Sequence, residues 1–167
     1  MKKQILFTVI SIILFGCSSD DYEENTTQQI PPVLEFNFDN QKFYNVVSYV
    51  NNHYSGWTWL SSDESMNTII SNISRHPNQS EETSDDIFID VFNSNPIEVG
   101  KIYTGSNLSI TINIDSKHWR CSDCDGEFVV TEIKDKKISG RFSGLLFNGL
   151  ENKSITNGVF KNISMNE

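Results

Sequence analysis

From residue 33 onward, hydrophobic and polar positions alternate along most of the chain, which is typical of β-strands with one buried face. The clearest example is residues 108–115, where leucine and isoleucine alternate with serine, threonine, asparagine and aspartate. Polar pairs such as Asp39-Asn40 and Asp135-Lys136 separate neighbouring segments and predict hairpin turns. The other expected strands are residues 33–38, 42–50, 57–59, 87–92, 127–134, 137–147 and 154–163, and residues 66–74 fit a strand slightly better than a short helix.

These strands predict an all-β fold, an antiparallel β-sandwich or a barrel-like single domain, over residues 33–167. The chain has no alanine and is rich in asparagine and serine, a composition that disfavours helices. Because isolated hairpins are only marginally stable, the strands must close into a barrel or pack as two sheets.

The amino-terminal segment has a different pattern. Lys2 and Lys3 precede an apolar run over residues 5–15, and Gly16 then stands directly before Cys17. This run is shorter than the ~20 apolar residues that span a bilayer, which argues against the alternative of an uncleaved membrane anchor. A small residue directly before a cysteine is typical of a lipoprotein signal peptide. We therefore expect residues 1–16 to be removed and Cys17 to carry a lipid that anchors the protein in the membrane.

Residues 17–32 are expected to form the lipidated cysteine and a flexible acidic tether that ends at Pro31-Pro32. The run Ser19-Asp20-Asp21-Tyr22-Glu23 resembles the surface-export signal of Bacteroidota lipoproteins. The resemblance implies a protein of the outer membrane that faces the cell surface. The alternative is that this charged run is only a solvated tether.

The charge of the chain limits its partners. Its formal net charge is −9, and removal of the two signal-peptide lysines makes the mature protein more acidic still. Such a protein repels phosphate backbones, so we expect no nucleic-acid partner. A basic protein partner would instead be favoured by charge complementarity.

The carboxy-terminal half, residues 97–163, carries a Gly-x-x-Tyr segment, a glycine-led strand, an Ile-Ser-Gly-x-Phe motif and an Ile-Thr-x-Gly-x-Phe motif. These segments are Gly100-Lys101-Ile102-Tyr103, Gly126-Glu127-Phe128-Val129-Val130-Thr131, Ile138-Ser139-Gly140-Arg141-Phe142 and Ile155-Thr156-Asn157-Gly158-Val159-Phe160. The pattern resembles a family of small Bacteroidota lipoproteins, and the resemblance implies a fold without assigning any catalytic residue. Within the strands, Gly140 and Gly158 are expected at bulges or at close contacts with a neighbouring segment.

Cys121 and Cys124 are the remaining cysteines, and in an exported protein we expect them to form a disulfide that closes a turn between the strands at residues 108–115 and 127–134. A zinc site formed by His118, Cys121 and Cys124 is an alternative, but it lacks a fourth protein ligand. A thioredoxin-like redox site would need a βαβ context. Acidic residues 123–127 lack the ligand pattern of an EF-hand calcium site. We expect no cofactor.

Aromatic and titratable residues leave the function open. Trp57, Trp59 and Trp119 are candidate ligand-binding residues for a sugar, although aromatic residues also dominate the cores of small β-domains. The expected function is a non-enzymatic binding or interaction module with a protein or glycan partner. The alternatives are a glycan-binding lipoprotein, an immunity-type lipoprotein, or a small hydrolase that uses His53 with Asp63 or Glu64.

Overall fold

The computed structural model of the chain describes residues 30–46, 48–50, 53–55, 59–62, 66–77, 85–92 and 96–166. The described residues form strands and turns, with no helix among them, and no helix long and apolar enough to cross a membrane is found in this part of the chain. The strands are β1 (Val33–Phe38), β2 (Gln41–Asn45), β3 (Ser48–Val50), β4 (His53–Ser55), β5 (Trp59–Ser62), β6 (Met66–Ser74), β7 (Asp86–Phe92), β8 (Ile102–Ile114), β9 (Lys117–Lys134), β10 (Lys137–Phe147) and β11 (Asn152–Asn166).

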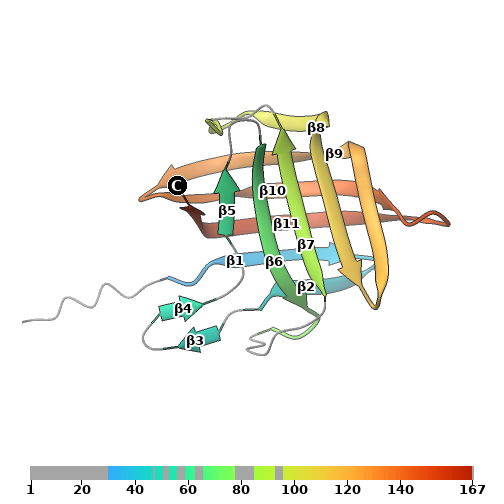
Figure 1. Cartoon of the computed structure of the whole chain (residues 1–167), viewed down its shortest axis with the longest axis horizontal. Helices are drawn as coiled ribbons and strands as arrows, with labels where there is room; N and C mark the ends of the chain where they lie inside the picture. The colour runs from blue at the N-terminus through green and yellow to red at the C-terminus, as the bar shows by residue number, and fades with distance from the viewer. Residues whose placement is uncertain are drawn as a thin grey trace, which may run out of the picture.

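Eight of these strands form a closed antiparallel barrel (Figure 1). The order around the barrel is β1, β2, β6, β7, β8, β9, β10 and β11, and β11 pairs with β1 to complete the ring. The short strand β5 runs parallel to the end of β11 and antiparallel to β6. Strands β3 and β4 form a separate two-stranded sheet. The predicted all-β antiparallel domain is therefore confirmed, and of its two expected forms the structure adopts the barrel.

Tight two-residue turns connect several of the long strands. Asp39-Asn40, Asp115-Ser116 and Asp135-Lys136 each have positive φ at both residues, between 51° and 62°. This is the backbone of a type I′ turn, whose twist matches that of antiparallel strands. The first and third turns confirm the sequence prediction. The second replaces the expected turn at the two cysteines, which lie within the long strand β9 instead.

Two further strand predictions need correction or refinement. The expected strand over residues 42–50 ends as β2 at Asn45, and residues 48–50 belong to the separate sheet. The buried side chain of Asn45 accepts a hydrogen bond from Leu34 N at 2.9 Å and donates one to Pro32 O at 3.0 Å. These two hydrogen bonds join the end of β2 to the start of β1. After the end of β2 the chain leaves the barrel wall. Residues 66–74, which were ambiguous in sequence, form strand β6.

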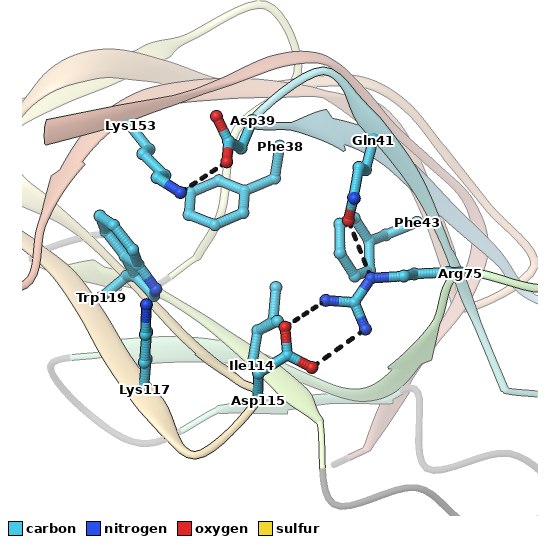
Figure 2. Close-up of a pocket in the computed structure, with 10 residues that line it drawn as sticks. All are labelled: Phe38, Asp39, Gln41, Phe43, Arg75, Ile114, Asp115, Lys117, Trp119 and Lys153. Carbon is cyan, nitrogen blue, oxygen red and sulfur yellow. Dashed lines mark hydrogen bonds and ion pairs between the residues drawn. The ribbon is translucent and has the colours of Figure 1, made fainter.

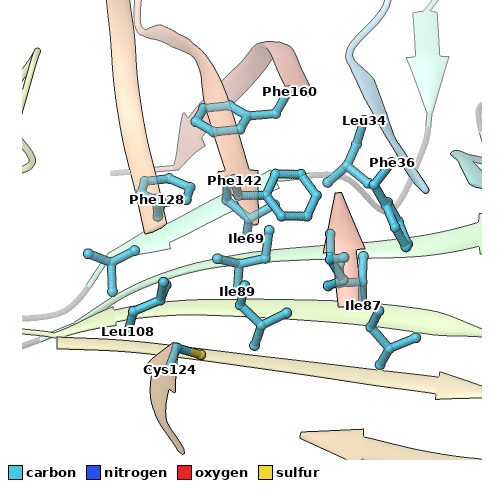
Figure 3. Close-up of a cluster of buried hydrophobic side chains, with 14 of the residues drawn as sticks. Leu34, Phe36, Ile69, Ile87, Ile89, Leu108, Cys124, Phe128, Phe142 and Phe160 are labelled. Atoms are coloured by element: carbon cyan, nitrogen blue, oxygen red, sulfur yellow. The ribbon is translucent and has the colours of Figure 1, made fainter. Parts of the chain in front are cut away.

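The barrel interior is filled by the inward-facing side chains of all eight strands (Figure 3). Aromatic rings make up much of this core: Phe36 stacks on Phe43 at a centroid distance of 5.5 Å, and Phe128 stacks on Phe160 at 4.9 Å. Small barrels are stabilised in this way, because a ring of eight strands is just wide enough for side chains to fill.

Two glycines allow the aromatic core to pack against the barrel wall. A Cβ atom on Gly140 would lie 2.1 Å from Val129 O and 2.4 Å from Cζ of Phe160. A Cβ atom on Gly158 would lie 2.4 Å from Phe142 O. The pairing of β10 with β11 shifts register next to both positions. The prediction that these glycines occupy close-contact positions is therefore confirmed.

Candidate functional site

The barrel has a pocket at the end where β1 turns into β2 and β8 turns into β9 (Figure 2). Its volume is about 330 Å³, and we call it the mouth. Residues from five strands and from the segments that adjoin them line it: Phe38, Asp39, Gln41, Phe43, Arg75, Ile114, Asp115, Lys117, Trp119 and Lys153.

The floor of the mouth is apolar and buried. Phe38, Phe43, Ile114 and Trp119 are inward-facing residues at the ends of β1, β2, β8 and β9 that meet at this end of the barrel. The Phe38 ring packs edge-on against Trp119, with centroids 5.3 Å apart. Because consecutive strand residues point to opposite faces, the same strand ends that supply the floor also supply the polar residues of the rim.

Arg75, directly after β6, fastens one side of the rim. Its guanidinium donates to both carboxylate oxygens of Asp115, at 2.6 and 3.2 Å, and to Gln41 Oε1 at 2.8 Å. The same group lies 5.0 Å from the ring centroid of Phe43 and 3.7 Å from the carboxylate of Asp85. A bidentate arginine–carboxylate pair is geometrically specific, so Arg75 fixes the β8–β9 turn relative to β2 and β6.

Lys153, at the start of β11, occupies the other side of the rim. Its ammonium forms an ion pair with Asp39 and lies 4.9 Å from the ring centroid of Trp119. The hydrogen bond to Asp39 raises the pKa of Lys153 above its ordinary value of 10.5. Desolvation opposes this shift, and the nearby charges of Asp39 and Glu151 each add a smaller increase. Lys153 is therefore a protonated cation that covers one face of Trp119.

Lys117 is the third cation of the mouth, and it differs from the other two. It is exposed at the start of β9, and among the described residues no carboxylate lies within ion-pair distance of its ammonium. In Figure 2 the Lys117 ammonium points toward the indole nitrogen of Trp119. The rim between Lys117 and Lys153 therefore carries positive charge in a protein that is acidic overall.

A second, more open groove adjoins the mouth. It has a volume of about 490 Å³ and shares Asp39 and Lys153 with the mouth. Its remaining lining residues carry amide, hydroxyl or ammonium groups: Asn37, Asn40, Lys42, Asn152, Ser154 and Thr156.

The structure brings together only part of what the sequence proposed for ligand binding. Trp119 lines the mouth, but it is 2% exposed, and its ring contacts Phe38 and Lys153. It offers no open face on which a sugar ring could stack. Trp57 lies outside the described residues, and Trp59 begins β5 with its side chain also outside them.

The expected disulfide between Cys121 and Cys124 is present, with the two Cα atoms 5.0 Å apart. It lies inside the barrel in the middle of β9, where β8 makes a register shift. His118 is exposed, and its Nδ1 lies 2.8 Å from Asn113 Oδ1. The three residues of the alternative zinc site are thus not assembled, and within the described part of the chain no group of histidine, cysteine and acidic residues is placed to hold a metal ion.

The hydrolase alternative depends on residues whose side chains lie outside the described part of the chain. Asp63 and Glu64 lie outside the described residues, and the side chain of His53, at the start of β4, does too. Apart from Trp119, sequence reasoning missed the residues of the mouth. The available signal was the presence of Lys117 beside a polar turn and of Lys153 shortly after Asn148-Gly149, but that signal does not show that the two lysines meet.

Comparisons with known proteins do not extend this description. No protein-family model matches the sequence, and no curated protein or solved structure matches it either.

Proposed function

We propose that this chain is a lipid-anchored lipoprotein of the outer-membrane surface, attached through Cys17, and that it acts as a non-enzymatic binding module with the mouth as its binding site. The observation that carries the proposal is the position of the mouth. Strand β1 starts at Val33, directly after Pro31-Pro32, and ends at Phe38 in the mouth. Six strand residues span about 20 Å, so a tether joined to the start of β1 would hold the end of the barrel opposite the mouth toward the membrane. The mouth would then face outward (Figure 1).

The charge distribution supports the same orientation. The β9–β10 turn carries Lys134, Lys136 and Lys137, with one carboxylate, Asp135, among them, at the end of the barrel where β1 begins. Pairing of Val33 with Lys161 and of Lys137 with Ser164 places this turn and the start of β1 on either side of the last residues of β11. Juxtamembrane lysines are attracted to anionic headgroups, whereas the rest of an acidic protein is repelled by them.

The lining of the mouth favours binding over catalysis. Its ten residues include three cations, two carboxylates, one amide and four apolar side chains, but no serine, cysteine, threonine or histidine. The mouth therefore lacks a hydroxyl or thiol nucleophile and a histidine base, which are the combination used by the common hydrolase triads. A concave pocket of a few hundred Å³ with an apolar floor and a few polar groups is instead the usual form of a small-ligand site.

A glycan is the second candidate ligand class, because the adjoining groove is lined by amide and hydroxyl groups that can hydrogen-bond to sugar hydroxyls. The groove and the mouth share Lys153 and Asp39, so one extended ligand could occupy both.

The anchoring part of the proposal can be tested in cells grown with labelled palmitate. We expect the full-length chain to take up the label and the Cys17→Ser variant to lose it. A variant with both Cys121→Ser and Cys124→Ser is the matched control and should keep the label. Protease treatment of intact cells should degrade the wild-type protein. Label retained in the Cys17→Ser variant would overturn the anchoring, and protection from protease would overturn surface exposure.

A further inference from the structure

We propose that the mouth binds the oxyanion of a small organic ligand, a carboxylate, sulfate or phosphate group, between Lys117 and Lys153 beside the indole N–H of Trp119. The inference rests on the mouth being the binding site proposed above, and it specifies the chemistry of the ligand.

The first step is the charge balance around the rim. Arg75 is paired with Asp115 through two hydrogen bonds, and Lys153 is paired with Asp39 and lies 3.9 Å from the carboxylate of Glu151. Lys117 has no carboxylate partner among the residues that the structure describes. The segment of the rim from Lys117 to Lys153 therefore has two cations and, of the lining residues, only Trp119 between them (Figure 2). An anion placed there meets the ammonium of Lys117 on one side and, on the other, the ammonium of Lys153, which it would share with Asp39 and Glu151.

The second step is the supply of hydrogen-bond donors. The indole nitrogen of Trp119 can only donate, and within the described residues no acceptor is paired with it. Lysine ammonium groups are also pure donors. Three donors at one place match an oxyanion, which is a pure acceptor, and hydrogen bonds to a charged acceptor are about twice as strong as neutral ones.

The third step is the environment of these donors. Trp119 is held by the edge of Phe38 and by the ammonium of Lys153, so its N–H direction is fixed before any ligand arrives. Phe38 and Ile114 form the apolar floor beside it. An apolar wall lowers the local dielectric constant and strengthens charge interactions. It also gives the non-ionic body of an organic ligand a surface to contact, which a free inorganic ion would not use.

Asp39 is the internal competitor of such a ligand, because its carboxylate already occupies Lys153. It lies in the β1–β2 turn with a φ of 51°, a conformation that asparagine also tolerates. An Asp39→Asn change would therefore keep the turn and remove the nearer of the two carboxylates beside the lysine, leaving Glu151 at 3.9 Å. This makes a gain of affinity testable, and a gain cannot result from misfolding.

The experiment measures binding by tryptophan fluorescence and calorimetry with inorganic phosphate, sulfate, glucuronate and, as the neutral match of glucuronate, glucose. The protein is the mature chain with Cys17→Ser. We expect at least one anion to bind more tightly than glucose, with an affinity that falls as salt rises. Lys117→Met should weaken anion binding about tenfold, the loss expected for one charged hydrogen bond. Asp39→Asn should strengthen it, and Lys134→Met, which removes a lysine at the opposite end of the barrel, should leave it unchanged.

The opposite results would overturn the inference. Equal losses for Lys117→Met and Lys134→Met would show that anions interact only with the surface charge. Binding of glucose as tight as that of glucuronate would show that the mouth binds ligands without using an oxyanion, so the proposed function would stand and this inference would fail. No binding of any anion would also refute it, and the palmitate experiment would then still decide the anchoring independently.

Discussion

Replacing Gly140 by alanine tests the packing that closes the barrel around its aromatic core. Alanine is normally the better residue in a strand interior, where glycine costs roughly 0.5–1 kcal/mol. Here the added methyl group would lie 2.1 Å from Val129 O on β9 and 2.4 Å from Cζ of Phe160 on β11. Both contacts are much shorter than a van der Waals contact, so the strands must separate or the Phe160 ring must move.

The size of the effect follows from these two neighbours. Overpacking of a well-packed core costs typically 1–3 kcal/mol, and here one of the contacted atoms belongs to the backbone and cannot rotate away. We expect Gly140→Ala to lower the free energy of unfolding by at least about 2 kcal/mol. In a Phe160→Leu background the ring contact is absent, so the cost of Gly140→Ala should fall while the contact with Val129 O remains.

The measurement is urea unfolding followed by circular dichroism for the wild type, both single variants and the double variant. Gly144→Ala is the matched control on the same strand, because its Cβ would be tight only against the flexible end of Ile110, at 3.2 Å, and would lie at an ordinary 3.6 Å from Cys121 Sγ and Leu146 Cδ1. We expect this control to change the free energy of unfolding by less than about 1 kcal/mol. An equal effect of Gly140→Ala and Gly144→Ala, or a stabilised Gly140→Ala protein, would refute the packing argument.

Three further predictions concern the disulfide, the start of the barrel and the mouth. Replacing both Cys121 and Cys124 by serine should lower the free energy of unfolding by about 2 kcal/mol, the loop-closure value for so short a loop, and unfolding curves with and without reductant check this. Asn45→Ala removes the hydrogen bonds that the Asn45 amide forms with Leu34 N and Pro32 O and should cost about 1–3 kcal/mol in urea unfolding, whereas an unchanged midpoint would show that the amide is dispensable. Because Asp39 raises the pKa of Lys153 above 10.5 in the folded state, the ion pair stabilises the protein below about pH 10.5 and is lost as the pH rises through the raised value. The stability difference between wild type and Lys153→Met should therefore shrink at alkaline pH, and a constant difference would contradict the ion pair.

The barrel was largely accessible to sequence reasoning, because each hairpin leaves a local signal. Asp39-Asn40 and Asp135-Lys136 are polar pairs that tolerate positive φ. The apolar positions of the alternation at 108–115 are buried residues of β8. The long strand β9 was not recognised as one element. Its outer face is a run of charged and polar residues, and the register shift beside the disulfide interrupts the period of two.

The mouth could not be predicted for a different reason. Lys153 and Asp39 are 114 residues apart in sequence, and they meet only because β11 pairs with β1 across the closure of the barrel. The position of that pairing depends on register shifts at Gly140 and between Glu35 and Asn37, which follow from side-chain packing in three dimensions. A lysine beside a turn looks the same in sequence whether it faces open solvent or lines a pocket. The chemistry of the site therefore depends on which strand ends are brought together when the barrel closes.

This dependence on closure also determines how stability and binding are related. The donors of the mouth are fixed by strand ends, by the Phe38–Trp119 contact and by the Arg75–Asp115 pair, whereas the Gly140–Phe160 contact involves other residues of the core. If the mouth is preformed, the folded Gly140→Ala variant should bind an anion with wild-type affinity. The substitution would lower the fraction of folded protein but leave the hydrogen-bond donors of the mouth in place. If the mouth assembled only when a ligand bound, affinity would fall together with stability, since the binding energy would have to complete the fold. Calorimetric titration of this variant well below its unfolding midpoint separates the two cases, and a loss of affinity there would refute a preformed mouth.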